Sequence, residues 1–399
     1  MQVQRGTAPR RGGSTTSTAS GAPALYHPVV IYLDHAATTP VSDAAWQAME
    51  PYLRERFGNP SEPHAAGRAA RAGLDEARAS VAATLGCAPA EVVFTGGGSE
   101  ADNLAVLGRL QGGGRVVASA IEHPAVREPL RAYGGEVAWA PVGGDGVVDL
   151  DALDVLVQPG DALCCVMAAN NVTGALQPVA AIAELCAARG VPLHVDAVQA
   201  ASGADVRALP GRTTLALAAH KLGGPKGVGA LAGPGVADLP VVVRGGGQEH
   251  GLRPGTENVA GAAALAAALA ARQGPDAPAE RAARAALRDR LERAAGVPAA
   301  AAGAPRLPGH ALLLAGVRGD LVVHQLDGAG ICVAAGSACA AGSTEPSYVL
   351  SAMGIDPAAA RGAVRVTLGP ETTSDEVDAF LTAFTAARDG LLRAVESVA

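Results

Sequence analysis

Several features that mark other protein classes are scarce in this chain of 399 residues. Charged residues make up 17% of it and aromatic residues 3%, whereas an average soluble domain is about 25% charged. The net charge is −7 and no block of basic residues occurs, which argues against a nucleic-acid partner. Apolar runs stop short of the roughly 18 residues that span a bilayer, and the longest one, residues 259–271, is ended by Arg272. We therefore expect neither nucleic acid nor a membrane as a partner.

The cysteines show no pairing pattern. None of them forms a CxxC motif, and their spacing is irregular: Cys87, Cys164, Cys165, Cys186, Cys332 and Cys339. A disulfide framework is not expected in a chain of this size, so the cysteines indicate a reducing compartment, and we expect a cytoplasmic protein. Residues 1–28 are rich in Ser, Thr, Gly, Pro and Arg and lack acidic side chains. This composition predicts a disordered tail, with an organelle transit peptide as the alternative.

Lysine is almost absent. The 31 basic side chains include only two lysines, Lys221 and Lys226, and both lie within residues 220–227. An amine can lose its proton and attack a carbonyl group, whereas a guanidinium with a pKa above about 12 cannot. A lysine that persists where arginine has replaced all others is therefore a candidate nucleophile.

Short apolar runs alternate with amphipathic segments through the first two thirds of the chain. The runs predict seven strands: Glu91–Thr95, Arg115–Ser119, Glu136–Val142, Ala162–Ala169, Pro192–Ala197, Thr213–Ala219 and Gly227–Ala232. Helices are predicted near 99–110, 123–132, 149–156 and 178–188. This alternation is typical of an α/β fold with a mostly parallel sheet that is covered on both faces. Ligands bind such sheets beyond the carboxyl ends of the strands.

The pattern changes after Gly255. An alanine-rich helix is predicted over Val259–Arg272 and a second helix over Ala279–Ala295, separated by a break at 274–278. A strand at 311–316, a helix at 319–327, a short strand at 331–334 and a loop of Gly, Ala and Ser follow. We therefore expect a tail (1–28), a large ligand-binding domain (29–258) and a smaller α+β domain (259–399).

Three polar motifs follow predicted strands. Residues 94–100 combine a strand end, three glycines and a helix start, where free N–H groups favour an anion such as phosphate; an ordinary capped turn is the alternative. Asp196 ends an apolar strand and needs a cation or a donor if it is buried. His194 shares its strand face, but no third ligand is evident, so we predict no metal centre. Lys221 follows the next strand, where burial would lower its pKa; a surface lysine is the alternative.

Together these motifs resemble the pyridoxal-phosphate cysteine desulfurases of the class V aminotransferase superfamily. The resemblance runs from about Tyr32 to Glu376 and rests on motifs in a fixed order: YLDHAATTP (32–40), GNPS (58–61), TGGGSEADN (95–103), EH (122–123), NN (170–171), HVDAVQ (194–199), HKLGGPKGVG (220–229), GGGQE (245–249), RPGTEN (253–258), GSAC (336–339), EPS (345–347) and RVTLG (365–369). It implies a large domain with the fold-type I seven-stranded sheet and a small domain that carries a cysteine loop.

The resemblance also implies how the cofactor ring is bound. Lys221 should bind pyridoxal 5′-phosphate covalently and later move the proton of the substrate Cα. Asp196 should pair with the pyridine nitrogen, and Gln199 should bind the ring hydroxyl. His123 should stack on the ring and exchange a proton.

The remaining site residues are implied in the same way. Gly98, Ser99 and His220 should hold the phosphate, together with Thr256 from the other subunit of a homodimer. Asn171 and Arg365 should bind the substrate carboxylate, which the planar fork of arginine matches.

Cys339 lies among Gly, Ala and Ser residues, a composition that suits a mobile loop. The resemblance implies that its thiolate takes the sulfur of L-cysteine as a persulfide, releases L-alanine, and passes the sulfur to an acceptor protein or a small thiol. The other five cysteines are interpreted as structural.

Four positions depart from the family pattern, of which Gly96 and Ser99 are mild replacements of Ser and Thr, and two other functions stay open. Ala218 replaces a common serine, so one phosphate hydrogen bond of about 1 kcal/mol should be missing. Val172 replaces a frequent glutamate. A selenocysteine lyase or another β-lyase with the same cofactor is the first alternative. A non-catalytic scaffold, favoured by Ala218 alone, is the second.

Overall fold

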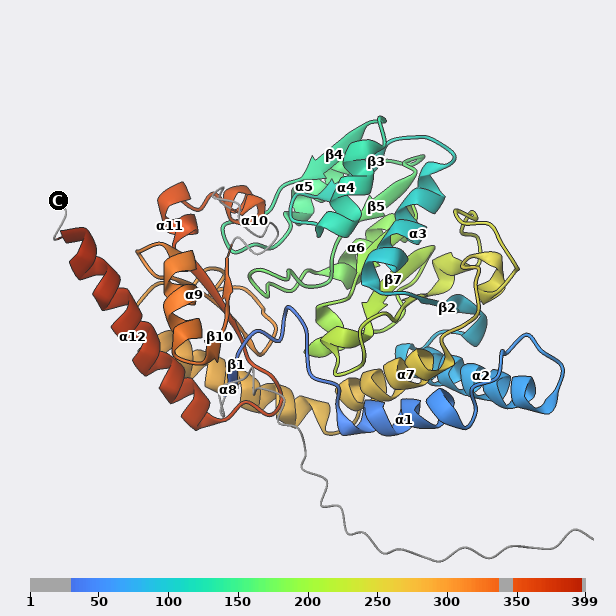
Figure 1. Cartoon of the computed structure of the whole chain (residues 1–399). Coiled ribbons are helices and arrows are strands. Elements are labelled where there is room, and N and C mark those ends of the chain that lie inside the picture. Colours follow the sequence, from blue (N-terminus) through green and yellow to red (C-terminus); the bar gives the residue numbers. More distant parts are fainter. Residues whose placement is uncertain (1–29, 337–346, 397–399) are drawn as a thin grey trace, which may run out of the picture.

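The structure, a computed structural model, describes residues 30–336 and 347–396 (Figure 1). Its centre is a seven-stranded sheet with the order β2-β8-β7-β6-β5-β3-β4. The strands are β2 (Val92–Thr95), β3 (Val116–Ser119), β4 (Val137–Ala140), β5 (Leu163–Cys165), β6 (Leu193–Asp196), β7 (Thr213–Ala218) and β8 (Gly229–Ala232). Neighbours from β7 to β4 are parallel, and only β8 runs antiparallel to both of its neighbours. The predicted α/β class and all seven strands are confirmed.

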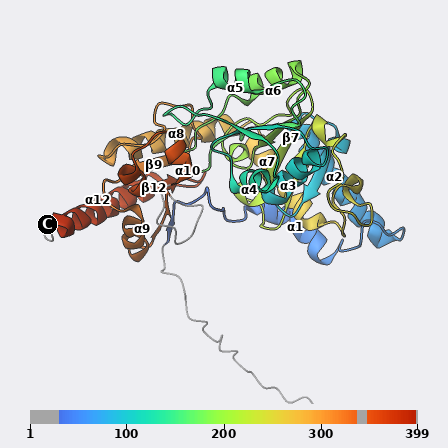
Figure 2. The same cartoon turned by 90° about the horizontal axis from the view of Figure 1, so that it is seen from above.

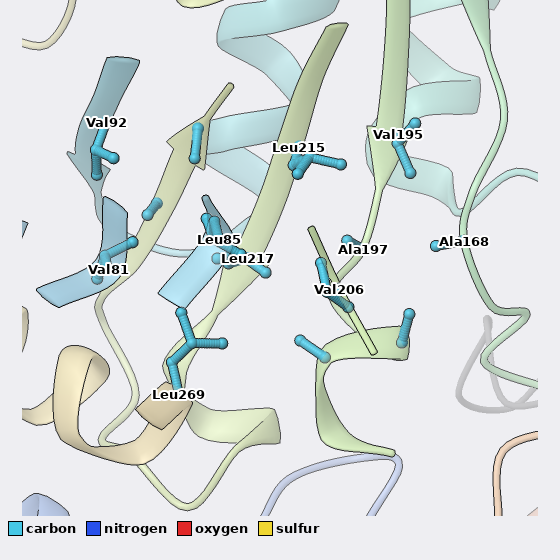
Figure 3. Close-up of a cluster of buried hydrophobic side chains, with 14 of the residues drawn as sticks. Val81, Leu85, Val92, Ala168, Val195, Ala197, Val206, Leu215, Leu217 and Leu269 are labelled. Atoms are coloured by element: carbon cyan, nitrogen blue, oxygen red, sulfur yellow. The ribbon is translucent and has the colours of Figure 1, made fainter. Parts of the chain in front are cut away.

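Both faces of this sheet are covered, which is why its strands are nearly continuous apolar runs. Leu215 and Leu217 of β7 pack on one face with helices α2 (Ala65–Leu85), α5 (Leu150–Leu156), α6 (Val179–Ala188) and α7 (Val259–Gln273). Figure 3 shows both leucines together with Leu85 and Leu269 in this cluster. Ala216, between them, faces α3 (Gly98–Leu110), and α4 (Pro124–Ala132) covers the same face further along.

Among the helices that were not predicted from the sequence, two belong to the large unit. Helices α1 (Asp43–Arg54) and α2 pack along α7 beneath the sheet (Figure 1). Ser42 caps α1 by accepting a hydrogen bond from the amide of Ala45, and Gly86, with φ of 75°, ends α2. The buried stripe of α2 is mostly Ala and Gly. Such a stripe differs little in hydropathy from the exposed face, so the helical period is weak in the sequence.

The smaller unit is built around a three-stranded antiparallel sheet with the order β11-β12-β9. Phe380 and Phe384 stack with ring centroids 5.5 Å apart in its core. The elements are α8 (Ala277–Ala294), β9 (His310–Leu314), α9 (Gly319–Gly328), β10 (Ile331–Cys332), β11 (Ala334–Ala335), α10 (Tyr348–Ala352), α11 (Pro357–Arg361), β12 (Ala363–Thr367) and α12 (Ser374–Glu396). Figure 2 shows these elements beside the large sheet.

At each end of the predicted large domain, one segment packs against a different unit from the one that the sequence suggests. Strand β1 (Ile31–Tyr32) pairs in parallel with β10, and Leu33 is buried in the core of the smaller unit. Helix α7, which follows residue 258, packs instead against α1 and α2 of the large unit. We therefore propose a domain boundary after Gln273, with β1 assigned to the smaller domain, in place of the division at 258/259 expected from composition.

Two sequence expectations lie outside the described residues: the disordered tail 1–28 and most of the Gly/Ala/Ser loop with Cys339. Among the helices that are described, none is long and apolar enough to cross a membrane.

A buried ion pair fixes the loop that precedes α7 to the sheet. Both terminal nitrogens of Arg78 in α2 donate to the carboxylate of Glu249 at 2.7 Å, and the amide of Phe94 in β2 donates to it at 2.8 Å. The two side chains are only 7% and 2% exposed. Glu249 and the next residue, His250, have φ values of 48° and 59°. This left-handed backbone is costly for non-glycine residues and persists where surrounding contacts enforce it.

We predict that Glu249→Ala lowers the free energy of unfolding by about 3–5 kcal/mol, because the Arg78 charge stays buried without a partner. Urea unfolding of the full chain measures this. Asp75→Ala is the matched control, since it breaks the exposed pair with Arg71 and should cost less than about 1 kcal/mol. Equal losses in the two variants would contradict the prediction.

Candidate active site

A cavity of about 240 Å³ lies beyond the carboxyl ends of β2, β6 and β7. The structure brings eight of the predicted site residues together in its wall: Gly98, Ser99, His123, Asn171, Asp196, Gln199, His220 and Lys221. Asp102, Met167, Val198 and Ala218 complete the lining. A parallel sheet gathers the residues that follow its strands at one edge, so side chains more than 100 positions apart in the sequence become neighbours.

Lys221 lies in a single helical turn (Ala219–Lys221) directly after β7. Its Nζ donates hydrogen bonds to the carbonyl oxygens of Ala36 and Ala37 at 2.5 and 2.8 Å. Burial, and then the positive charge of Arg365, lower the pKa of this amine to about 8. A larger fraction of the amine is therefore neutral and nucleophilic near pH 7 than for an ordinary lysine.

Asp196 ends β6 and is 5% exposed. Its carboxylate accepts a hydrogen bond from the amide of Val198 at 2.9 Å. Burial raises the pKa of Asp196, while His123 and Lys221 lower it. A buried carboxylate in a cavity wall is stabilised by a cationic partner inside the cavity.

His123 caps α4, and its Nδ1 accepts a hydrogen bond from the amide of Ala125 at 3.1 Å. Burial lowers its pKa, so the ring is neutral at pH 7. One ligand atom from each of His123, Asp102 and Asp196 lies within 4.8 Å of the others. Two buried carboxylates at this distance repel each other unless a proton or a cation reduces their charge.

Asp102 is the main site residue that the sequence analysis missed. Its Oδ1 lies 3.1 Å from Nε2 of His194, whose Nδ1 lies 3.0 Å from the hydroxyl of Thr214. Burial, Asp196 and Glu122 raise the pKa of Asp102, and burial lowers the pKa of His194 to about 3. The neutral ring of His194 therefore holds Asp102 in position, and within the described residues it is not paired with Asp196. The signal was available, because Asp102 lies three residues after Ser99 and so shares its helix face.

Glu122 is a third buried acid near the cavity. It is 0% exposed, and its Oε1 accepts hydrogen bonds from the hydroxyl of Ser119 and from the amide of Met167. Its Oε2 is buried without a hydrogen-bond partner among the described residues. Burial raises its pKa to about 7, so the carboxyl group is partly protonated near neutral pH.

Arg365 is outside the cavity wall proper and joins the two domains. It belongs to β12, is 3% exposed, and donates to the backbone carbonyl of Asn171 at 3.0 Å and to Asp34 at 2.8 Å. The Nε of Arg365 and the Oδ1 of Asn171 are buried without partners within the described part of the chain. These two groups are available to a ligand. Asp34, which pairs with Arg365, was not predicted as a site residue.

The N-terminus of α3 forms the opposite end of the cavity. A Cβ atom at Gly98 would lie 2.6 Å from Cγ2 of Val198, so only glycine fits without displacing that side chain. The Nδ1 atom of His220 lies 3.2 Å from the hydroxyl oxygen of Thr38. A more open hollow of about 490 Å³ continues past Ser99 toward Lys226. Free amides at a helix N-terminus bind anions, so this end suits a phosphate group.

Among the predicted site residues that the structure describes, Arg365 and Thr256 do not line this cavity. Thr256 is exposed in the loop before α7 and is absent from the cavity wall. Cys339, the predicted nucleophile, lies outside the described residues.

Comparisons with known proteins agree on one family. The model of the family "Aminotransferase class-V" matches residues 31–380. A "Cysteine desulfurase" from Cereibacter sphaeroides is 42% identical over 368 residues, which cover 88% of this chain and 94% of that protein. Among solved structures, a "NIFS-LIKE PROTEIN" aligns with a TM-score of 0.82 and 31% identity over 91% of this chain and all of the other. "SspA in complex with cysteine" aligns with a TM-score of 0.75 and 29% identity over 86% and 99% of the two chains.

We predict that Lys221 reacts with amine reagents at a pH at which ordinary lysines do not. Below its pKa the amine is protonated and unreactive. With a pKa of about 8, roughly a quarter of it is neutral at pH 7.5, against about 0.1% for a lysine of ordinary pKa. Lys226→Arg leaves Lys221 as the only lysine, and mass spectrometry of peptides labelled over a pH series gives its apparent pKa. The same peptide in urea is the control, and an unchanged profile would contradict the prediction.

We also predict that Glu122 makes the ligand-free protein less stable as the pH rises. Its folded pKa of about 7 lies above its usual value of 4.5, so the folded state holds the proton more tightly than the unfolded state. The stabilisation is complete below about pH 4 and is lost as the pH rises through 7. Compared with Glu122→Gln, wild type should therefore lose about 3 kcal/mol between pH 4.5 and 8. Urea unfolding at both pH values measures this, with Glu128→Gln at an exposed position as control. Parallel pH profiles of wild type and Glu122→Gln would refute it.

Proposed function

The chain belongs to the cysteine desulfurases of the aminotransferase class-V family, and from this we propose that it converts L-cysteine to L-alanine and transfers the sulfur through Cys339 to an acceptor. One observation carries the proposal: the amine of Lys221 and the carboxylate of Asp196 share one cavity, and the pKa of the amine is lowered to about 8. A nucleophilic amine opposite a buried acid is what an aldehyde cofactor with a basic ring nitrogen requires.

Pyridoxal 5′-phosphate fits the residues present. Asp196 supplies the buried acid for a ring nitrogen, and Gly98 and Ser99 supply amides at a helix N-terminus for a phosphate. Gln199 is 5% exposed and lies in the same wall, where it can reach a ring hydroxyl. When bound, this cofactor supplies an aldehyde for covalent attachment and a ring that accepts electron density from the substrate.

The side chains of the protein bind the substrate and transfer its protons. Arg365 and Asn171 bind the substrate carboxylate by donating N–H groups of the guanidinium and of the side-chain amide, since a carboxylate only accepts hydrogen bonds. Lys221 holds and releases the proton of the substrate Cα, which its lowered pKa permits near pH 8. His123, neutral and beside Asp196, donates or accepts a second proton.

Sulfur transfer requires a thiol that reaches both the substrate and an acceptor. Cys339 follows Gly336, the last described residue before the gap, which lies next to Ala363 in the strand that carries Arg365. The segment that carries Cys339 therefore begins beside β12, the strand whose Arg365 is proposed to bind the substrate. The thiolate of Cys339 attacks the substrate sulfur, so that the S–S bond of a persulfide forms as the Cβ–S bond of the substrate breaks. The electron pair left on the substrate Cβ takes up a proton, and alanine is released.

The proposal includes a second copy of the chain. Thr256 is exposed, and the hollow beside Gly98 and Ser99 is open to the surface. We propose that Thr256 of one subunit enters this hollow of the other in a homodimer and completes the phosphate site. We further propose a cytoplasmic location and, as acceptor, a protein thiol or a small thiol.

We predict that Lys221→Ala abolishes alanine formation from L-cysteine and the absorbance near 420 nm (about the region expected for a lysine-bound cofactor). Lys226→Ala removes the only other lysine and should retain both. If Lys221→Ala keeps the 420 nm band, or if purified wild type binds no pyridoxal phosphate, the proposal fails and a non-catalytic scaffold becomes the better interpretation.

We predict that Cys339→Ser loses the enzyme-bound persulfide while it retains the cofactor, because the hydroxyl cannot accept the sulfur. Cys332→Ser, in β10, is the matched control and should retain transfer. Mass spectrometry of the enzyme after incubation with L-cysteine measures the added sulfur. Full persulfide formation in Cys339→Ser would refute the assignment. Comparison of turnover on cysteine and selenocysteine distinguishes a desulfurase from a selenocysteine lyase.

A further inference from the structure

A second, much smaller cavity lies on the other side of Lys221, between the two domains. Its volume is about 20 Å³, and a cavity needs about 10–15 Å³ to hold one water molecule. It can therefore hold one or two atoms of that size and is too small for a phosphate or an amino acid. Its wall combines the start of the described chain, helices α7 and α8, and the ends of β9 and β12, and its titratable residues are His35, Lys221, Arg272, Arg284 and His310.

The charged groups in this wall are all positive. Lys221, Arg272 and Arg284 line it, and no aspartate or glutamate does so within the described residues. Arg284 pairs with Glu280, which lies outside the wall. Arg272 donates its Nε to the backbone carbonyl of Leu222 at 3.2 Å rather than to a carboxylate. Arg272 thus forms no ion pair in the described chain, and the acids that act on its charge, Glu280 and Glu371, lie outside the wall.

Two neutral histidines add hydrogen-bonding groups without partners. His310 is 5% exposed, and its Nε2 is buried with no hydrogen-bond partner in residues 30–336 and 347–396. The Nδ1 of His35 is also buried without a hydrogen-bond partner among the described residues. Burial and the charges of Arg365, Arg284 and Lys221 hold the pKa of His310 well below its usual range. A neutral imidazole can present an N–H group toward the cavity.

From this wall we infer a binding site for a small monovalent anion of chloride size between the two domains. Arg272, Arg284 and His310, whose buried Nε2 has no partner in the described chain, line a space that fits one such ion, and no aspartate or glutamate of the described residues lines it. An anion there would contact α7 of the large domain and α8 and β9 of the small domain at once. Its binding would therefore stabilise the relative position of the domains, and with it Arg365 opposite the large cavity.

The experiment uses the full chain with its cofactor bound. Thermal unfolding is followed as chloride replaces gluconate at constant ionic strength. Each tenfold rise in chloride above the dissociation constant should raise the midpoint by about 1.5–2 °C. Arg272→Gln, which leaves no acid unpaired, should remove this dependence. Arg293→Gln, at an exposed position on α8, is the control for loss of one positive charge and should keep it.

Crystals grown in bromide provide a test that does not depend on a variant that folds. An anomalous peak between Arg272, Arg284 and His310 supports the site. A peak without anomalous signal, which is a water molecule, overturns it. A midpoint that chloride does not change, or that changes equally in Arg272→Gln, overturns it as well. None of these outcomes depends on desulfurase activity, so failure of the anion site and failure of the proposed function are distinguishable.

Discussion

The arrangement of this molecule depends on one unfavourable interaction: Asp102 and Asp196 are buried close together at the carboxyl edge of the sheet. Neither carboxylate has a salt bridge to lysine or arginine in the described chain, and burial raises the pKa of both. Burying two such acids costs free energy unless the site later receives a cation or a proton. His194 and Thr214 hold Asp102 in place beneath the cavity. The two buried carboxyl groups therefore favour the binding of a positively charged group, and this is the position where we propose that the cofactor ring nitrogen binds.

The second constraint is the position of the small domain. Arg365 can serve a ligand in the large cavity only if β12 stays beside Asn171, and three contacts hold it there. Arg365 donates to Asn171 and Asp34, β1 pairs with β10, and the amide of Ala36 donates to the hydroxyl of Thr367 at 2.9 Å. Apart from the hydrogen bond to Asn171, these contacts involve the segment that starts the described chain. This segment also supplies the carbonyl groups that accept hydrogen bonds from Lys221, so it links Lys221 to the smaller domain.

Much of the fold was predictable because its signal is local. The seven strands of the large sheet are apolar runs between turns, and each was identified from the sequence within a few residues. Helices α1 and α2 were missed because alanine and glycine form the buried stripe of α2 and leave little contrast between its faces. Residues that follow strands, such as Lys221 and Asp196, were predictable as site residues because sheet topology gathers them. Asp102 and Asp34 were missed because their importance arises from partners, His194 and Arg365, that are distant in the sequence.

The scarcity of lysine has a structural consequence beyond marking the nucleophile. Arginine keeps its charge when buried, since its pKa lies above about 12, whereas a buried lysine would lose its proton and its electrostatic effect. Arg365 is the largest charge effect that lowers the pKa of Lys221, and Arg272 and Arg284 line the small cavity behind it. Positive charge from permanent cations disfavours protonation of the single amine among them. Because Arg365 keeps its charge, its effect on the pKa of Lys221 persists at every physiological pH, whereas a buried lysine in its place could lose that effect with its proton.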